Sequence, residues 1–570
     1  MDNVSLSSMI LSEDYLDVLV PYQPPLERIL QEFADYGAQY LGGNYVMLHI
    51  PRSRLSANYL NDVGYSNLPK LYTTLDTVSL EQSGILPVQN LPGYAFRGKD
   101  VLIGFLDTGI SYAAPAFRTS TGTTRILGIW DQTIQGNAPF GLGYGTGFTR
   151  EQIDEALALP DPLSLVGVTD EEGHGTFLAS VAAGSPDPEN QFTGAAPECD
   201  IAMVKLKPAK ENLKNFFLIP ADALAFQETD LMMGIRYLEL LAAQHRKPLV
   251  ICIGLGTNQG DHSGSSPMAA VLNSLSSVFG VYPIVAAGNE AGRGHHFYGK
   301  LEGQGSSSMV EILSAAGTAG FSLELWAQSP ELYSVSIFSP SGESIPAIPP
   351  RLRQNTTIDF VLEKTVIHVN YEIVEVSTGN QLIILRFENP TEGIWSIRVT
   401  NESFINGVFH MWLPISGFLP PETQFLAANP ETTLTEPSSA AGAVTVSTWD
   451  AYTGSLYIHS SRGFTRTGAV KPDLAAPGVG VTGTAAGYGS TGGFRYRRDT
   501  GSSIAAAITS GAVALLVNWE ATRRIPRVPT AAEVRNLLIR GAVRDQDQRY
   551  PNQYWGYGKL NLYGVFQNLI

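Results

Sequence analysis

Cysteine is nearly absent from this sequence: Cys199 and Cys252 are the only two among 570 residues. Two thiols cannot form the dense disulfide framework on which small secreted domains depend. Both lie in short apolar stretches typical of buried strands or strand ends, where a cysteine behaves as a small hydrophobic residue. We therefore predict two buried free thiols.

Basic residues are also scarce. The chain has 37 Lys and Arg residues against 53 Asp and Glu residues, which gives a formal net charge of −16. Nucleic acids and anionic membranes bind to basic surfaces, because protein cations must replace their counterions. The sequence therefore predicts no nucleic-acid partner and no membrane partner.

Long hydrophobic runs are lacking as well. Residues 1–20 contain no basic segment followed by an apolar stretch, so they do not resemble a signal peptide. No stretch of about 18 uncharged apolar residues stands out as a membrane span. These absences predict an intracellular protein without a signal peptide or a transmembrane segment.

What the chain does contain is enough apolar material for several folded units. Hydrophobic residues make up 44% of it and charged residues 16%, which excludes a disordered chain. Its 57 glycines and 35 prolines indicate many turns. The length of 570 residues predicts about two to four structural units.

Residues 1–78 have the pattern of a small separate unit. Apolar residues at helical spacing run up to the Gly42-Gly43 pair, which can end a helix. The order strand, helix, strand, helix, strand is typical of a small α/β sandwich. The expected members are strands at 15–21, 44–50 and 71–75, and helices at 26–40 and 53–62.

The rest of the chain shows two patterns. Uninterrupted apolar runs at 101–106, 248–253 and 283–287, with helical stretches between them, are typical of parallel strands covered on both faces by helices. Short alternating strands separated by turns are typical of an antiparallel β-sandwich. We therefore predict an α/β domain in two parts, 79–304 and 435–570, with a β-sandwich inserted at 305–434.

Three polar residues stand where an α/β sheet collects reactive groups. Asp107 ends the apolar run 101–106 just before a turn, and ligands gather at the carboxyl ends of such strands. His174 opens a helix between small residues, and Ser503 begins another helix after Gly501. Such a set can activate a serine, because the imidazole takes the hydroxyl proton while the carboxylate orients the imidazole.

A fourth residue completes the set. Asn289 lies just past the apolar run 283–287, where its amide and the backbone N–H of Ser503 can donate hydrogen bonds to an oxyanion. Each segment alone has a plain alternative, namely a turn aspartate, a helix-capping histidine or a helix of small residues. The four together, in this order, indicate nucleophilic catalysis by a serine.

These segments resemble the motifs of the subtilases, the subtilisin-like serine peptidases. The likeness covers about residues 98–300 and 435–570 and includes Lys471-Pro-Asp-Leu-Ala-Ala-Pro-Gly478 upstream of the serine. It implies a serine endopeptidase of α/β fold that cleaves protein or peptide substrates. No cofactor is implied, and no acidic loop has the spacing of calcium ligands.

The resemblance also implies a role for individual residues. It makes Asp107, His174 and Ser503 the catalytic triad and Asn289 the oxyanion donor, and it places Glu290 near the rim of the S1 pocket. The two walls of that pocket would be Gly254, Leu255 and Gly256 on one side and Ala286, Ala287 and Gly288 on the other.

The sequence departs from the family pattern at two places. Around the serine it reads Gly-Ser-Ser-Ile-Ala-Ala-Ala, where the family has Gly-Thr-Ser-Met-Ala-x-Pro. After the histidine it reads Thr-Phe-Leu-Ala instead of Thr-His-Val-Ala. Both changes leave the triad intact and leave the rate and the pocket shape open.

The unit at 1–78 resembles a subtilase prodomain, which templates folding and then plugs the active site. This implies self-cleavage between about Leu71 and Ser83. With the inserted sandwich read as a jelly roll, the resemblance narrows to the clostridial Csp proteases. Those proteins keep the prodomain bound and act in spore germination by activating a cortex-lytic proenzyme. The implied location is the cytoplasm or the spore.

Two other functions fit the same motifs. A binding or signalling protein on a subtilase scaffold would not need catalysis, and a general intracellular peptidase would have no link to spores.

Two further segments are interpreted as ordinary loops. We interpret Gly294-His-His-Phe297 as a surface loop rather than a metal site, and Asp170-Glu-Glu172 as a solvated loop beside His174.

Overall fold

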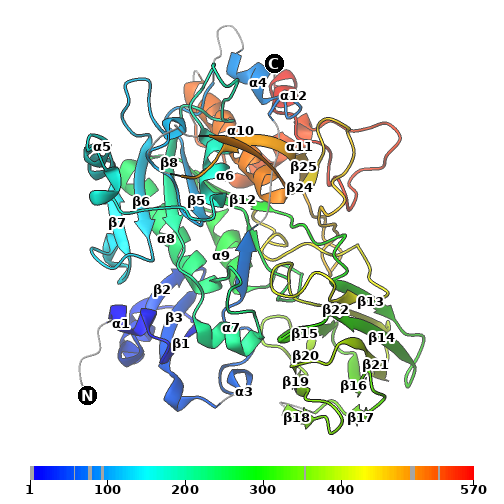
Figure 1. Ribbon diagram of the computed structural model, residues 1–570. Helices are drawn as coiled ribbons and strands as arrows, with labels where there is room; N and C mark the ends of the chain where they lie inside the picture. Colours follow the sequence, from blue (N-terminus) through cyan, green and yellow to red (C-terminus); the bar gives the residue numbers. More distant parts are fainter. Residues whose placement is uncertain are drawn as a thin grey trace.

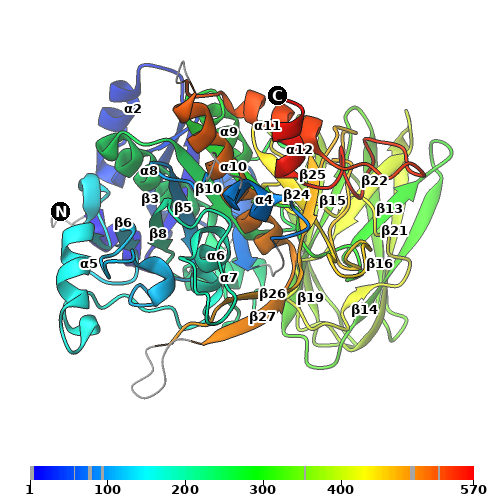
Figure 2. The ribbon, with the colours of Figure 1, turned by 90° about the horizontal axis from the view of Figure 1, so that it is seen from above.

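The computed structural model describes residues 6–56, 58–74, 80–90, 96–351, 355–487, 495–523 and 527–569. An α/β part with an eight-stranded sheet occupies the upper half of Figure 1. Below it lie the N-terminal unit, defined here as the described residues between 6 and 70, and an antiparallel β insert. Figure 2 views the molecule from above and shows the insert at one side of the α/β part.

The central sheet has the strand order β25-β24-β12-β10-β5-β8-β6-β7, and it is parallel except for β7 at one edge. The apolar runs of the sequence form its middle strands, because a strand covered on both faces has no polar side. The predicted parallel sheet is therefore confirmed. Its members are β5 (Leu102–Asp107), β6 (Ile126–Asp131), β7 (Thr146–Thr149), β8 (Asp200–Lys205), β10 (Leu249–Ile253), β12 (Val281–Ala286), β24 (Val444–Trp449) and β25 (Leu474–Pro477).

Two hydrophobic clusters cover the two faces of this sheet. Leu102 and Ile103 are neighbours on β5 and belong to different clusters, because successive side chains of a strand point to opposite faces. Each cluster includes buried residues of helices that pack on its face. These helices are α6 (His174–Ala183) and α10 (Ser502–Thr522) on the face of Ile103, and α8 (Glu228–His245) and α9 (Pro267–Leu275) on the face of Leu102.

Helix α10 differs from the other helices in its length and apolar composition. Among the residues that the structure describes, it is the one helix long and apolar enough to cross a membrane. The prediction of no such stretch missed it. However, 94% of its apolar window is buried inside the protein, so its small and apolar side chains pack against the central sheet as those of a core helix do.

The two cysteines lie where the sequence predicts them. Cys199 and Cys252 are buried free thiols. Burial raises the pKa of each thiol to about 12, because a thiolate would lose its hydration in the apolar core. Both thiols therefore stay protonated at neutral pH and are poor nucleophiles.

The N-terminal unit is a three-stranded antiparallel sheet of order β1-β3-β2 with short helices. Its second strand is one that the sequence pattern did not predict. The elements are α1 (Leu6–Leu11), β1 (Tyr15–Pro21), α2 (Leu26–Glu32), β2 (Gln39–Gly42), β3 (Tyr45–Pro51) and α3 (Tyr59–Val63).

Two helix predictions for this unit are wrong in extent. The helix expected at 26–40 ends at Glu32, where Phe33 leaves the helical conformation with φ −111° and ψ 23°. A short 3-10 helix, Ala34–Tyr36, follows and ends at Gly37, which has a left-handed φ of +59°, and the chain continues as β2. The helix expected at 53–62 is confined to Tyr59–Val63. In addition, the extended segment β4 (Leu71–Thr74) does not join the sheet of the unit, but pairs with two short strands of the α/β part.

The insert consists of two antiparallel sheets that share one hydrophobic core, as the alternating pattern predicts. Their strand orders are β13-β22-β15-β20-β19-β18 and β17-β16-β21-β14-β23. The first sheet includes β13, which precedes residue 305, the predicted start of the insert. The strands are β13 (His296–Lys300), β14 (Ser307–Ser314), β15 (Gly320–Ala327), β16 (Leu332–Phe338), β17 (Ser344–Ile348), β18 (Asn355–Asp359), β19 (Val366–Glu372), β20 (Gln381–Glu388), β21 (Gly393–Ser403), β22 (Val408–Trp412) and β23 (Gln424–Phe425).

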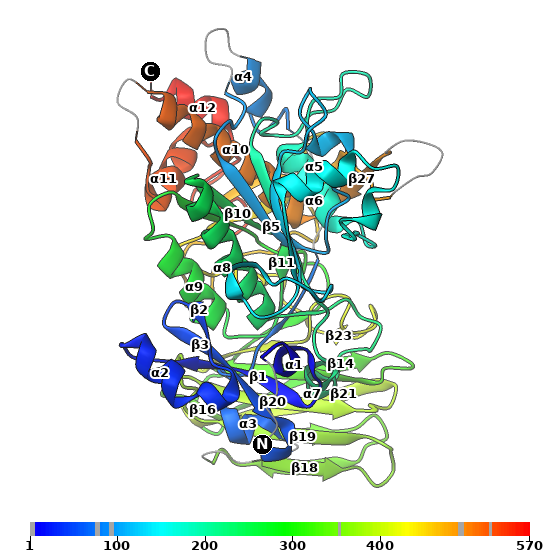
Figure 3. The same ribbon diagram turned by 90° about the vertical axis from the view of Figure 1, so that its left-hand side faces the viewer.

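The three parts are in direct contact. Figure 3 shows the N-terminal unit below α8 and α9 and alongside strands of the insert. The hydroxyl of Tyr65 in the unit donates a hydrogen bond to Glu324 in the insert. The remaining elements are β9 (Phe226–Gln227), β11 (Leu255–Gly256), β26 (Val479–Thr484), β27 (Tyr496–Thr500), α4 (Ile85–Asn90), α5 (Arg150–Leu157), α7 (Glu211–Phe217), α11 (Ala531–Gly541) and α12 (Leu562–Gln567).

Candidate active site

Asp107, His174 and Ser503 meet at the carboxyl edge of the central sheet. The Nδ1 atom of His174 lies 2.8 Å from Oδ1 and 3.0 Å from Oδ2 of Asp107, and its Nε2 atom lies 3.1 Å from Oγ of Ser503. A carboxylate only accepts, so Nδ1 carries the proton and Nε2 accepts from the serine hydroxyl. This is the protonation state in which an imidazole can take the hydroxyl proton.

The local backbone brings these three groups together. Asp107 is the last residue of β5, His174 the first of α6 and Ser503 the second of α10. Two glycines allow the close approach. A Cβ on Gly175 would lie 2.2 Å from the backbone oxygen of Gly109, and a Cβ on Gly254 would lie 2.8 Å from Cβ of Ser503.

Asp170 holds this arrangement in place through hydrogen bonds to its backbone and side chains. Its Oδ1 accepts from Thr108 Oγ1 at 2.7 Å and from the backbone N–H of Gly173 at 2.9 Å, while its Oδ2 accepts from Thr176 Oγ1 at 2.6 Å. The residue is 5% exposed, so the interpretation of this segment as a solvated loop is wrong for Asp170. Its carboxylate ties the turn after Asp107 to the first turn of α6.

Asn289 stands beside the serine with its amide held in one orientation. Its Oδ1 accepts from the backbone N–H of Ser502 at 3.0 Å, so the Nδ2 end is the donor end of the group. The backbone N–H of Ser503 lies in the first turn of α10, where it has no acceptor within the helix. The two donors can serve one oxyanion next to Ser503.

The two expected pocket walls begin at the carboxyl ends of two neighbouring strands of the central sheet, β10 and β12. Gly254 precedes β11, which contains Leu255 and Gly256, and Ala286 ends β12, followed by Ala287 and Gly288. A residue missed by sequence reasoning, Thr435, lies between the walls. A Cβ on Gly256 would lie 2.4 Å from its Oγ1, and a Cβ on Gly288, whose φ is +108°, would lie 2.6 Å from its Cγ2. Both glycines are therefore required for packing.

Glu290 is not near the surface, so its predicted place at the pocket rim is wrong. It is 2% exposed, and its Oε2 lies 2.6 Å from Nδ1 of His295 and 3.1 Å from Nδ2 of Asn258. Burial opposes its ionisation, but the charge and hydrogen bond of His295 outweigh it and lower the pKa of the Glu290 carboxyl. Glu290 therefore anchors the chain after Asn289 and does not face a substrate.

The adjacent residues His295 and His296 are buried too, so their interpretation as a surface loop is wrong. His296 donates from Nδ1 to the backbone oxygen of Asn429 at 3.1 Å, and its Nε2 accepts from Nδ1 of His410 at 2.9 Å. The rings of His296 and His410 both stack on Trp412. No group of three or more potential ligands in the described part of the chain could hold a metal ion.

His296 and His410 make the stability of the fold sensitive to acid. Burial lowers the pKa of His296 to about 3, and burial together with the charges of His296, Arg466 and His262 lowers the pKa of His410 well below its usual range. An unfolded chain takes up these protons near pH 6.5, so the stabilisation is complete above that pH and falls as the pH drops toward 3. Between pH 7 and pH 5 we expect the free energy of unfolding to fall by about 2 kcal/mol for each histidine.

Urea unfolding at the two pH values, followed by tryptophan fluorescence, measures this loss, because Trp412 lies in the stack. His410→Gln is the matched variant: glutamine can still donate to His296 but does not titrate. It should lose less stability on acidification than the wild type. An equal loss in both proteins would contradict the assignment.

A segment of the same chain fills the gap between strands β11 and β9, which we call the cleft. Strand β4 lies between β11 and β9, antiparallel to both, with Thr74 opposite Leu255 and Thr73 opposite Gly256. An added strand in a groove between two strand edges is how extended peptides bind to proteins. Ser503 is fully buried and His174 is 7% exposed, so the reactive groups are covered.

Comparison with known proteins gives one strong and several weak similarities. A family model described as the subtilase family matches residues 98–319 and 368–558. The structure of the CspB protease of Clostridium perfringens has a TM-score of 0.76 and 30% identity, over 86% of this chain and 97% of that one. The comparison with curated proteins gives no match.

Two other structures are less similar. Fervidolysin of Fervidobacterium pennivorans, a keratinolytic enzyme related to subtilisin, has a TM-score of 0.48 at 12% identity and covers 97% of this chain and 61% of its own. MycP1 of Mycobacterium smegmatis has a TM-score of 0.37 at 16% identity, with coverages of 87% and 89%. Similarities this low add nothing to the assignment.

Proposed function

The chain belongs to the subtilase family of serine peptidases, and from that premise we propose that Asp107, His174 and Ser503 are the catalytic triad of an active endopeptidase. The observation that carries the proposal is the continuous set of hydrogen-bond distances from Asp107 through His174 to Ser503. A protein kept only for binding would have no need of this geometry, which disfavours a catalytically inactive relative.

The geometry supports acyl transfer in two steps. Oγ of Ser503 attacks the peptide carbonyl while Nε2 of His174 takes its proton, and Asp107 stabilises the imidazolium. Nδ2 of Asn289 and the backbone N–H of Ser503 hold the oxyanion. His174 then gives the proton to the departing amine, which leaves an acyl-enzyme. Water, deprotonated by the same imidazole, hydrolyses the ester and restores Ser503.

We further propose that the N-terminal unit is a prodomain that the enzyme cuts from itself. The support is β4, whose backbone occupies the cleft as a substrate would. In an antiparallel substrate strand, Thr73 opposite Gly256 and Thr74 opposite Leu255 take the third and second positions before the cut. A substrate in this register presents its next residue opposite Gly254, beside Ser503.

This register predicts the bond that is cut. The residue after Thr74 is Leu75, so cleavage should fall between Leu75 and Asp76. Residues 75–79, the middle of the self-cleavage region expected at Leu71–Ser83, lie outside the described residues. N-terminal sequencing of the purified protein should therefore give Asp-Thr-Val-Ser-Leu as a new terminus. A cut elsewhere would show that β4 is not bound as a substrate, and no cut at all would contradict self-processing.

We infer that the insert is a jelly roll. If β13, β14, β15, β16, β17, β20, β21 and β22 are numbered one to eight, the two sheets contain the orders 1-8-3-6 and 2-7-4-5. Two Greek keys folded into a double sheet have this arrangement. Strands β18 and β19 then extend one sheet and β23 the other.

A restricted biological role fits better than general protein degradation. A peptidase whose cleft is filled by its own chain cannot act freely on unfolded proteins. Since the chain is similar to the CspB protease, we propose the role that its resemblance to the Csp proteases implies, which is spore germination through a cortex-lytic proenzyme. The expected substrate is a folded protein with one exposed extended segment. Cleavage of many proteins in a spore extract would instead favour a general peptidase.

A further inference from the structure

Asp17 of the N-terminal unit lies buried against the α/β part, with 1% exposed. Its Oδ1 accepts from Nδ1 of His49 at 2.6 Å and from Nζ of Lys210 at 2.9 Å, and its Oδ2 accepts from Nε2 of Gln227 at 2.6 Å. Burial opposes ionisation, but Lys210 and His49 outweigh it and hold the pKa of the Asp17 carboxyl well below its usual range. Asp17 is therefore an anion that joins two segments of the α/β part.

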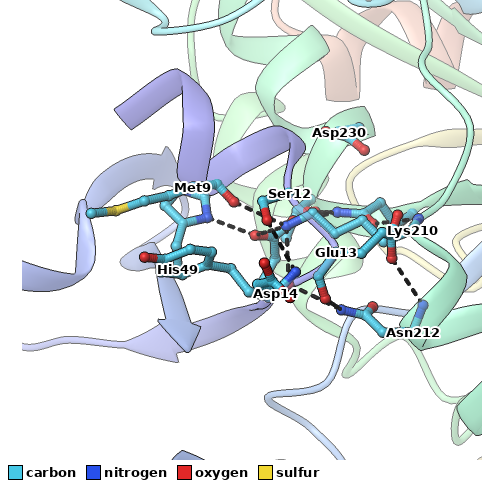
Figure 4. Close-up of polar contacts among 12 residues, drawn as sticks. Met9, Ser12, Glu13, Asp14, His49, Lys210, Asn212 and Asp230 are labelled. Carbon is cyan, nitrogen blue, oxygen red and sulfur yellow. Dashed lines mark hydrogen bonds and ion pairs between the residues drawn. The ribbon is translucent and has the colours of Figure 1, made fainter. Parts of the chain in front are cut away.

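Further hydrogen bonds hold the same contact together. Nζ of Lys210 also donates to the backbone oxygens of Met9 and Tyr15, and the backbone N–H of Asn212 donates to Glu13 at 3.1 Å. Figure 4 shows Lys210 and Asn212 on one side of this contact and Met9 and Glu13 on the other. The segment at 210–212 thus meets a fixed set of acceptors on the unit.

Gln227 connects this contact to the cleft. It is one of the two residues of β9, which pairs with β4 through Gln227 opposite Leu71 and Phe226 opposite Tyr72. Its side chain is fully buried, and its Oε1 accepts from the backbone N–H of Lys210 at 3.3 Å. The backbone of β9 therefore faces the cleft while its glutamine side chain is held by Asp17.

Without Asp17 this edge of the cleft would lose its support. Lys210 is 3% exposed and would have a buried charge without its carboxylate, and Gln227 would lose an acceptor. Such unpaired buried groups are costly, so the segment would rearrange to reach water. Because β9 contains Gln227, its backbone would shift with it.

We propose that the N-terminal unit forms one edge of the substrate-binding cleft, with Asp17 as the positioning residue that holds β9 through Gln227 and Lys210. The proposal rests on the proposed function, because it assigns β9 to the substrate of that site. Strand β9 would bind substrate residues at the fourth and fifth positions before the cut, where Tyr72 and Leu71 stand in β4. The unit then stays useful after cleavage, since long substrates need it.

Two peptide phosphonates that label the active serine test the proposal. The short one has the sequence Thr-Thr-Leu of residues 73–75, and the long one has Leu-Tyr-Thr-Thr-Leu of residues 71–75. Only the long one reaches β9. For the wild type we expect the long probe to label about ten-fold faster, from the added backbone hydrogen bonds. Both probes must displace strand β4, so the cost of displacing it slows both equally and does not change the ratio of the two labelling rates.

Asp17→Asn should bring this ratio close to one, because the long probe loses its advantage when β9 shifts. Asp17→Glu should restore part of the ratio, because it keeps the charge for Lys210. Asp14→Asn is the matched control at an exposed aspartate of the same unit and should keep the wild-type ratio. Gel filtration of each variant reports whether the unit stays bound, and its release together with loss of the ratio also supports the proposal.

The outcomes distinguish failure of the catalytic assignment from failure of the role proposed for β9 and Asp17. If neither probe labels the wild type, the catalytic assignment itself fails. If both probes label but the long one has no advantage, β9 does not bind substrate and the proposal is overturned. It is also overturned if Asp17→Asn slows both probes equally, because Asp17 would then serve only the stability of the fold.

Discussion

Ser503→Ala should leave a folded protein of full length, 61.4 kDa, that neither cuts itself nor reacts with a fluorophosphonate probe. The alanine removes the only atom that can form the acyl bond, and His174 alone cannot replace it. We expect kcat for a peptide substrate to fall by about 10⁶-fold, which leaves only what the oxyanion donors contribute. Gel electrophoresis for the self-cleavage and a fluorogenic peptide for turnover measure the two effects.

Ser510→Ala is the matched control for this experiment. Ser510 is buried in the same helix, α10, and its hydroxyl donates to the backbone oxygen of Ala506 at 2.8 Å. This variant should process itself and react with the probe as the wild type does. Self-cleavage that continues in Ser503→Ala would show that another group makes the cut, and the triad assignment would be wrong.

The sequence was sufficient for the parts of the site that depend on local pattern. Asp107, His174 and Ser503 each stand at the end of a strand or the start of a helix, and those boundaries follow from apolar runs and small residues nearby. A parallel sheet then brings strand ends to one edge, so their meeting could be anticipated. The antiparallel insert was predictable for a similar reason, since alternation is a property of neighbouring residues.

The parts that could not be predicted depend on contacts between distant segments. The resemblance to the subtilases implies a place for Glu290 at a pocket rim, and no local signal in the sequence shows that His295 will pair with it in a buried setting. Tyr40 follows helical spacing, yet its segment forms β2 because β3 offers a strand edge. Asp17 sits in an ordinary strand pattern, and only the packing of the unit against Lys210 shows that its charge has a partner.

Strand β4 shows the same limit at the cleft. Its sequence predicts an extended segment, but nothing in it indicates whether it joins the sheet of its own unit or another. In the structure the unit's sheet consists of β1, β3 and β2, and β4 instead occupies the gap between β11 and β9. The choice depends on which strand edges remain unpaired once the whole chain has folded.

Asn289→Ala should lower kcat by about 10²- to 10³-fold with little change in KM, because the lost hydrogen bond forms mainly in the transition state. The measured substrate constants separate this effect from a change in binding. Since Oδ1 of Asn289 also accepts from the backbone N–H of Ser502, the alanine removes an anchor of the serine loop as well.

Asn289→Asp distinguishes the two roles of this residue. The aspartate keeps an acceptor for Ser502 but places a negative oxygen where the amide donor stood, next to the developing oxyanion. If the donor matters, Asn289→Asp should be at least as slow as Asn289→Ala, although the loop is anchored. If the anchor matters instead, Asn289→Asp should recover most of the wild-type rate, and the oxyanion would then depend on the helix N–H of Ser503 alone.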